Sequence, residues 1–309
     1  MINFKSEQEG FYTLRLGTID ADGKEVDCYE PVPTFTNLIT NSGLEQQADN
    51  GAWLRKISVG SGSSVPSVDD TALANFVAST TSTQNSVSGT QGTEPFFTWR
   101  RVTRRFSEGA AAGNLSEVGI GGDTELFSRA LIRDTDGNPT TITVSAEQFL
   151  DVTYEYRFYP KLTDSTGSVT LGGSVAGTYD YIFRSSEVTS SSTFSGWSIG
   201  TTGTSMGADA GNASGSLFYD GDIGAINAGP GGLQSAASSF SRLAYSAGSL
   251  EREFRLTCSL TQGNLAGGIR SARVKMGIGT FQIQFDPPIP KTDERTLVLD
   301  FSHSWGRRA

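Results

Sequence analysis

The chemistry that this sequence could perform rests on a few short runs of residues, and the first has the form of a serine hydrolase. Gly196-Trp197-Ser198-Ile199-Gly200 matches the nucleophile-elbow pattern, and Asp286 or Asp300 and then His303 follow in the chain order that those enzymes use. An elbow needs a helix directly after the serine, whereas residues 201–205 are poor helix formers. His303 is the only histidine and stands in an alternating strand pattern, where packing accounts for it. We therefore expect no catalytic residues and no enzymatic activity.

Aspartate-rich turns offer oxygens that could bind calcium. They are Asp20-Ala21-Asp22-Gly23, the run 134–138 and Asp220-Gly221-Asp222, and none continues to the full spacing, with a bidentate glutamate, of an EF-hand loop. Asp-Gly and Gly-Asn-Pro runs form tight turns without a metal. Gly60-Ser61-Gly62 lacks the third glycine of a dinucleotide fingerprint, and no Cys/His cluster suits zinc. We predict neither metal nor cofactor, with calcium at the Asp-Gly turns as an open alternative.

The run 99–106 is the one concentrated basic segment. On a strand, Arg101 and Arg105 would share one face with the tryptophan that begins the run, and Arg100 and Arg104 would share the other face. A net charge of −9 and a pI near 4.8 argue against general binding to nucleic acid or to anionic membrane. The four arginines are therefore predicted to pair with carboxylates of a neighbouring subunit.

The elements that must position these residues are predicted to be short strands, because the chain has 37 glycines, many Ser and Thr residues and only 18% charged residues. The expected strands cover residues 11–16, 53–59, 96–106, 117–120, 125–133, 140–144, 149–158, 251–260, 271–286 and 296–305. A short helix capped by Gly43 is predicted within residues 37–44. Residues 80–93 and 189–234 are predicted to be long exposed loops rich in Gly and Ser.

The two halves of the chain carry similar patterns. Gly113-Asn114-Leu115 recurs as Gly263-Asn264-Leu265, and the run 57–61 resembles the run 197–201. Each half also closes on an alternating strand, in which Tyr156 and Phe158 correspond to His303 and Trp305. We therefore predict an all-β protein with two tandem, duplicated β-sandwich domains, at residues 1–158 and 161–309.

The chain is also predicted to stay in the cytoplasm after synthesis. Its first residues have no apolar segment of an export signal, and no apolar run is long enough to span a bilayer. Cys28 and Cys258 fall at non-equivalent places in the two halves, so a repeated disulfide is excluded. We expect both cysteines to be reduced, small apolar residues.

Several short motifs of the first half occur in a fixed order. They are Asn37-Leu38-Ile39-Thr40-Asn41-Ser42-Gly43-Leu44, Ile57-Ser58-Val59-Gly60-Ser61-Gly62, Pro66 with Asp69-Asp70-Thr71-Ala72-Leu73, Ser116-Glu117-Val118-Gly119-Ile120 and Leu126-Phe127-Ser128-Arg129-Ala130. In this order they resemble structural proteins of tailed bacteriophage virions, of the tail, baseplate and collar type. The resemblance covers about half of the chain, and the second half keeps only the strand skeleton.

This resemblance implies a non-enzymatic virion protein that is assembled in the host cytoplasm and located in the tail region. It would be a trimer or hexamer associated with the tail or baseplate, and it would join rings or attach fibres together with other virion proteins. The main alternative is a receptor- or glycan-binding tail fibre or spike protein, in which Tyr179, Tyr181 and Trp197 line a sugar-binding surface. A neck or collar protein and the Ser198 hydrolase are more distant alternatives.

Overall fold

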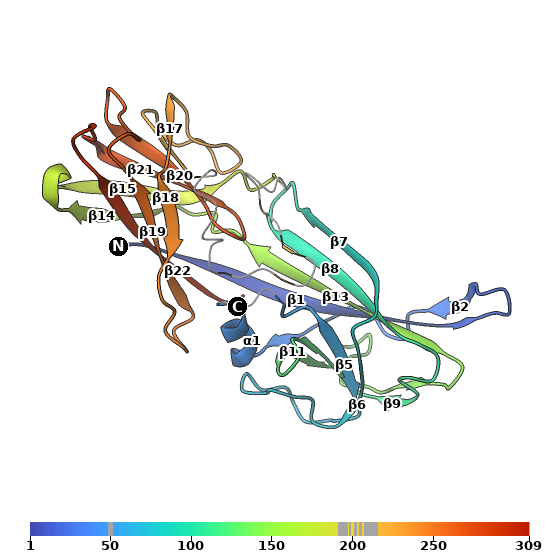
Figure 1. Cartoon of the computed structure of the whole chain (residues 1–309). Helices are drawn as coiled ribbons and strands as arrows, with labels where there is room; N and C mark the ends of the chain where they lie inside the picture. Colours follow the sequence, from blue (N-terminus) through green and yellow to red (C-terminus); the bar gives the residue numbers. More distant parts are fainter. Residues whose placement is uncertain are drawn as a thin grey trace.

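The computed structural model describes residues 1–48, 52–190, 197, 199–200, 203, 206 and 216–308. Within these residues the chain is almost entirely β-strand, with one short α-helix and one 3-10 turn (Figure 1). The prediction of an all-β protein is therefore confirmed. No helix in the described part of the chain is long and apolar enough to cross a membrane.

The first half of the chain forms two packed sheets. The larger layer consists of β7 (Thr83–Thr90), β8 (Thr98–Phe106), β13 (Phe149–Tyr159) and β1 (Ile2–Ile19), in that order. The second layer has the order β4 (Leu38–Ile39), β11 (Leu126–Leu131), β10 (Glu117–Gly121), β5 (Lys56–Gly60) and β6 (Phe76–Thr80). Smaller elements are β2 (Glu25–Tyr29) and β3 (Phe35–Thr36) beside β1, the pair β9 (Gly113–Leu115) and β12 (Ile142–Val144), and α1 (Asn41–Gln46).

The second half contributes a six-stranded sheet. Its order is β14 (Ser165–Leu171), β15 (Gly177–Ser186), β21 (Thr280–Ile289), β20 (Ile269–Lys275), β16 (Leu217–Tyr219) and β17 (Gln234–Ala236), with the 3-10 turn η1 (Gly173–Val175) between β14 and β15. The remaining strands β18 (Ser239–Arg242), β19 (Glu251–Cys258) and β22 (Leu297–Arg307) join the larger layer of the first half, so that one nine-stranded sheet runs through the molecule.

The strand order of the first half recurs in the second. The order β4-β11-β10-β5-β6 matches β15-β21-β20-β16-β17, and β7-β8-β13 matches β18-β19-β22. Tyr156 lies opposite the buried Arg100, and His303 lies opposite the buried Arg252. The similarity between the runs 57–61 and 197–201 does not follow this match of strand orders. The run 57–61 includes most of β5, and the strand at the same place in the second sheet is β16, not the segment around Trp197. This recurrence is what a duplication predicts, although superposition of the two halves stays a prediction.

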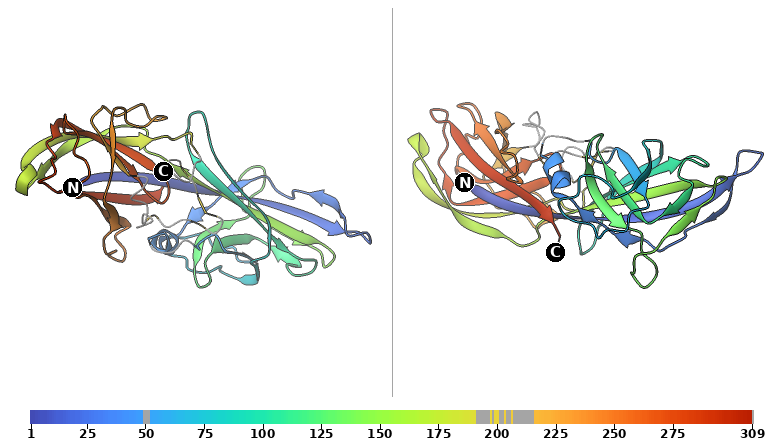
Figure 2. Two further views of the ribbon diagram at one scale, coloured as in Figure 1. Left: turned by 45° about the horizontal axis from the view of Figure 1, so that its top comes forward. Right: turned by 90° about the horizontal axis from the view of Figure 1, so that it is seen from below.

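Strand β1 belongs to both sandwiches. Residues 7–17 pair antiparallel with β13, whereas residues 2–8 pair parallel with β22 (Figure 2). Tyr12 packs on Tyr154 in the first sandwich, and Phe4 stacks on Phe183 in the second. A boundary near residue 160 therefore separates the two halves of the sequence but does not separate the folded layers. Strand β1, which belongs to the first half, contributes to the core of the second half.

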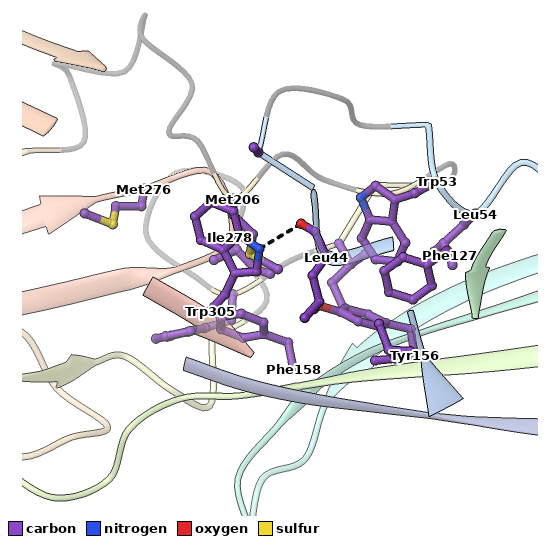
Figure 3. Close-up of a cluster of buried hydrophobic side chains, with 14 of the residues drawn as sticks. Leu44, Trp53, Leu54, Phe127, Tyr156, Phe158, Met206, Met276, Ile278 and Trp305 are labelled. Carbon is purple, nitrogen blue, oxygen red and sulfur yellow. Dashed lines mark hydrogen bonds between the residues drawn. The ribbon is translucent and has the colours of Figure 1, made fainter. Parts of the chain in front are cut away.

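The two cores meet at a buried seam. The Trp305 indole N–H donates to the Leu44 carbonyl over 2.9 Å, which links β22 to α1 (Figure 3). Beside it, the side-chain amides of Gln8 and Gln47 bond each other, and Tyr156 donates its hydroxyl to Gln8. All these side chains are buried, and each of them is hydrogen-bonded within the protein.

Several elements differ from the sequence expectations. The helix spans residues 41–46 and begins at the N-cap Thr40, so that Gly43 lies inside it and does not end it. Within the predicted loop 80–93, residues 83–90 form β7, because they pair with β8. The predicted strand 271–286 is two strands, β20 and β21, joined by a turn. Part of the predicted loop 189–234 lies outside the described residues, and in the described part residues 217–219 form β16, which pairs with β20.

His303 occupies the seam as a neutral, packed ring. Its imidazole stacks on Phe4 with ring centroids 4.6 Å apart, and its Nε2 hydrogen-bonds the Ser6 hydroxyl over 2.8 Å. Burial disfavours the charged form and lowers the pKa of His303 to about 3. The imidazole is therefore uncharged at neutral pH. An uncharged, buried ring agrees with the packing role that the sequence predicts for His303.

This burial predicts an acid-sensitive fold. The unfolded histidine has a pKa of about 6.5, so the folded state should lose about 1.4 kcal/mol of stability for each pH unit between about 6.5 and 3. We expect the His303→Phe variant to lack this loss, because phenylalanine keeps the ring and cannot be protonated. Urea unfolding of both proteins from pH 7 to pH 4 measures it, and the carboxylates titrate equally in both. Parallel curves would contradict the burial of a neutral histidine.

Candidate functional site

Three of the five motifs of the first half meet at one buried carboxylate, Glu117. Its oxygens accept the N–H groups of Gly62, Ala74 and Asn75 at 2.7–3.0 Å. The Arg129 guanidinium donates to the same carboxylate over 2.8 Å. Burial by itself raises the pKa, and these donors more than reverse that effect, so the pKa of Glu117 is lowered. The glutamate thus fastens the long segment between β5 and β6 onto the sheet.

Arg129 extends this network to the other motifs. It also binds the Asp70 carboxylate over 2.6 Å and the Ser64 carbonyl over 3.0 Å. On the next strand, the Thr40 hydroxyl donates to the Leu126 carbonyl and caps α1. A Cβ on Gly43 would lie 2.1 Å from the Phe127 carbonyl oxygen, so only glycine lets the helix pack this closely. The motif residues are therefore spaced to build one part of the fold.

A buried ion pair of this kind should be costly to break. We expect Glu117→Gln to reduce the free energy of unfolding by about 3–5 kcal/mol, because the mutation leaves the buried Arg129 without its main counter-charge. As a matched control, Asp123→Asn removes an exposed partner of Arg55 and should cost under about 1 kcal/mol. Chemical denaturation of the two variants measures both effects. Equal losses would contradict the role of Glu117 as an anchor.

Two of the four predicted interface arginines point into the molecule. Arg100 donates from Nε and a terminal nitrogen to the Ile199 carbonyl, at 3.0 and 2.6 Å. Arg104 donates to the carbonyls of Leu54 and Thr81, each over 2.8 Å. Both guanidinium groups are buried, so in this fold they cannot contact a neighbouring subunit. Assigning them to an interface is therefore wrong, because carbonyl groups of the same chain take their hydrogen bonds.

Arg101 and Arg105 lie on the opposite, outward face, as strand alternation predicts. Arg101 stacks on Trp99 at 4.6 Å and pairs with Glu155. Arg105 binds Asp151 over 2.6 Å, and the same nitrogen reaches Glu25 over 2.7 Å. These carboxylates belong to the same chain, so the pairing that we predicted between subunits occurs within one subunit. Whether the face is also an interface stays a prediction.

The strand registers arrange this outward face in rows of alternating charge. One row places Asp151 between Arg15 and Arg105, and another places Arg157 next to Glu9. A row of threonines lies between the charged rows, where Thr103 bonds Thr153 and Thr13 bonds Thr34. Aromatic rings lie beneath the guanidinium groups, in the pairs Arg105 with Phe149, Arg157 with Phe11 and with Phe97, and Arg101 with Trp99. The face is neutral as a whole and rich in Arg and aromatic residues, the composition of protein interfaces.

The three predicted glycan-binding aromatics do not share a surface. Tyr179 and Trp197 are buried, and the Trp197 indole N–H donates to the Ser186 carbonyl. Tyr181 is half-buried and lies opposite the buried Phe285 on the core side of its sheet. The expected sugar-binding surface is therefore wrong for Tyr179 and Trp197, because core packing uses their rings.

An open groove of about 430 Å³ lies beside Tyr181, on the solvent side of β14, β15 and β21. It is lined by Thr166, Gly167, Ser168, Asp180, Tyr181, Ile182, Gln284 and Asp286. Ser168 already donates to Asp180, and Arg270 to Asp286. By strand alternation the Tyr181 side chain belongs to the opposite face from Asp180 and Ile182, and no other aromatic residue lines the groove.

Of the candidate hydrolase residues, Asp286, Asp300 and His303 belong to the described part of the chain. Ser198 lies outside the described residues. Asp300 pairs with Arg255 and Asp286 pairs with Arg270, while the buried His303 bonds Ser6. The described geometry thus gives Asp286 and Asp300 other partners than the histidine.

The aspartate turns use their own oxygens. Asp20 accepts the N–H groups of Asp22 and Lys24, and Asp134 accepts those of Asp136 and Asn138, at 2.8–3.0 Å. Within the described ranges, no group of three or more His, Cys, Asp or Glu side chains could hold a metal ion. Both cysteines are free; Cys258 is buried, whereas Cys28 is exposed beside Arg15.

Comparisons with models of protein families, with curated proteins and with solved structures found no match to this chain.

Sequence reasoning missed most of the outward face. Arg157 lies two residues after Glu155 on β13, and Phe11 lies two residues after Glu9 on β1. The two-residue period of a strand could therefore have placed the members of each pair on the same face. The register between the strands could not be found, because it depends on pairing across more than 130 residues.

The two outward arginines should differ in what they contribute. Arg105 is 15% exposed between two carboxylates, and we expect Arg105→Met to reduce the free energy of unfolding by about 1–3 kcal/mol. Arg101 is 50% exposed, so Arg101→Met should cost under about 1 kcal/mol. Urea unfolding at two salt concentrations compares them. An Arg101 variant that loses more stability than the Arg105 variant would contradict this description of the face.

Proposed function

We propose that this chain is a non-enzymatic structural protein of a tailed bacteriophage virion, an oligomer of the tail or baseplate that joins rings or attaches fibres. The observation that carries the proposal is the convergence of the motif residues on Glu117. These motifs carry the resemblance to virion proteins, and their residues hold one another in a single network. The motif spacing is thus tied to a particular fold, which supports kinship with that group.

The proposed mechanism is geometric. The nine-stranded sheet runs through an elongated body, and the β1–β2 hairpin projects beyond one end of it (Figure 1). Such a body can span from one neighbour to the next, with the rows of paired charges on its outward face as a contact surface. Other virion proteins and further copies of the chain are the proposed partners.

Duplication is part of the same proposal. The recurrent strand order and the matched pairs of Arg100 with Tyr156 and Arg252 with His303 support two copies of one ancestral sandwich. A duplicated chain presents two similar domains for each subunit, so three subunits could contact a ring of six.

Two observations support an architectural role over the alternatives. The burial of Tyr179 and Trp197 removes the aromatic platform on which glycan binding depends. The pKa of His303, about 3, leaves the only histidine without the basicity of a catalytic base at neutral pH.

The test is to find the chain in particles. In virions purified from a phage that encodes it, we expect its peptides at a fixed ratio to the major tail proteins, and antibodies against it should label the tail in negative-stain images. A phage-encoded enzyme from the same infected cells is the control and should be depleted during purification. A chain that is abundant in the lysate but absent from the particles would contradict the proposal.

A further inference from the structure

Strand β7 forms one edge of the nine-stranded sheet, and no described segment pairs with its outer side. Natural proteins protect such edges with charged residues, proline or very short strands. Residues 71–93, which include all of β7, contain no charged residue and no proline. The edge strand at the other end of the sheet, β18, has only four residues and ends in Arg242. Within the described residues, the segment 86–90 of β7 therefore has none of these three protections.

The backbone groups that point outward from this edge can be identified. The Gln91 N–H donates to the Phe97 carbonyl over 2.7 Å, so residue 91 faces β8. Antiparallel pairing alternates this orientation, which directs Val87 and Gly89 toward β8 as well. The N–H and C=O groups of Ser86, Ser88 and Thr90 then point away from the sheet. They form a regular ladder on which another strand can pair.

Strand β7 carries an exposed valine and, two residues later, a glycine that an aromatic ring covers. Val87 is 40% exposed on the outward face of the sheet. Gly89 follows on the same face, and the Trp99 ring lies over it, since a Cβ at this glycine would be 2.9 Å from the indole. An exposed β-branched side chain thus stands beside a site where an aromatic ring covers a bare backbone.

We propose that β7 pairs antiparallel with β7 of a second copy of this chain, across a two-fold axis at Ser88. In this register the outward residues form the pairs Ser86 with Thr90, Ser88 with Ser88 and Thr90 with Ser86, which make about six hydrogen bonds. Val87 of each copy then lies opposite Gly89 of the other and packs against the Trp99 ring that covers it. The same strand provides both the exposed Val87 and the ring-covered Gly89, which is what a two-fold contact requires.

The absence of charge on β7 favours this occupant. Like charges placed opposite each other destabilise a strand pair, and two identical uncharged strands bring none together. The pairing would join the nine-stranded sheets of the two copies into one and would place their outward faces side by side. This inference does not depend on a role in a virion.

The first test removes one outward N–H group. In Ser88→Pro the proline replaces an N–H that does not pair with β8, so the fold should persist and the dimer should be lost. Val87→Lys is a second variant, which leaves the backbone unchanged and brings two ammonium groups toward the axis. Val87→Thr is its matched control and should still dimerise. Light scattering gives the mass, and thermal unfolding checks the fold.

The second test locates the axis. In a Cys28→Ser background, Ser88→Cys should form a disulfide between two copies, because the two Cα atoms would lie about 5.5 Å apart. Thr170→Cys, on the uncharged edge strand β14, is the control and should not cross-link. Non-reducing gels and the mass of the product provide the readout.

We expect the mass of the wild-type protein to be an even multiple of the monomer mass. Ser88→Pro and Val87→Lys should each halve this mass, and Ser88→Cys should cross-link. A monomeric wild type, a plain trimer, or an oligomer that Ser88→Pro and Val87→Lys leave intact would overturn the proposal. Efficient cross-linking at Thr170 without cross-linking at Ser88 would also overturn it. Each of these results is independent of whether the chain is found in virions.

Discussion

The whole structure depends on one strand that pairs on both of its sides over different parts of its length. Residues 7–17 of β1 pair with β13, and residues 2–8 pair with β22. Successive side chains of a strand point to opposite faces of the sheet, so the even-numbered residues of β1 share one face. These residues include Ile2 and Phe4 in the second core and Tyr12 and Leu14 in the first. A shift of β1 by one residue would expose both sets of side chains at once. The two sandwiches are therefore held in a single register.

At three places inside the protein, buried charges are met by groups of the same chain. Glu117 is met by N–H groups and Arg129, and Arg100 and Arg104 are met by carbonyl oxygens. The cost of removing these charges from water is thereby offset by directed hydrogen bonds. Such contacts connect segments that would otherwise be long loops. They explain how a chain rich in glycine and serine can form an ordered body.

Much of the fold could be predicted, because apolar and polar residues alternate along most of β13 and β22. The two-residue period of a strand placed Arg101 and Arg105 of β8 on one face and Arg100 and Arg104 on the other. It could not find the acceptors of Arg100, since the Ile199 carbonyl lies 99 residues away. Strand β7 was missed because Ser, Thr, Gln and Asn give no apolar period, and only its pairing with β8 makes it a strand. The position of α1 was missed because Thr40 caps it against Leu126.

The shared strand also determines the order in which the protein can be completed during synthesis. Ser6 leaves the ribosome early, whereas its partner His303 follows 297 residues later. The first sandwich can close once β13 has been made, but the leading residues of β1 must wait for β22. Contacts between such distant residues form slowly, because a long loop must be closed first. The leading residues of β1 thus stay without their β22 partners while the chain between Ser6 and His303 is synthesised, and during this time they are exposed to wrong strand pairing.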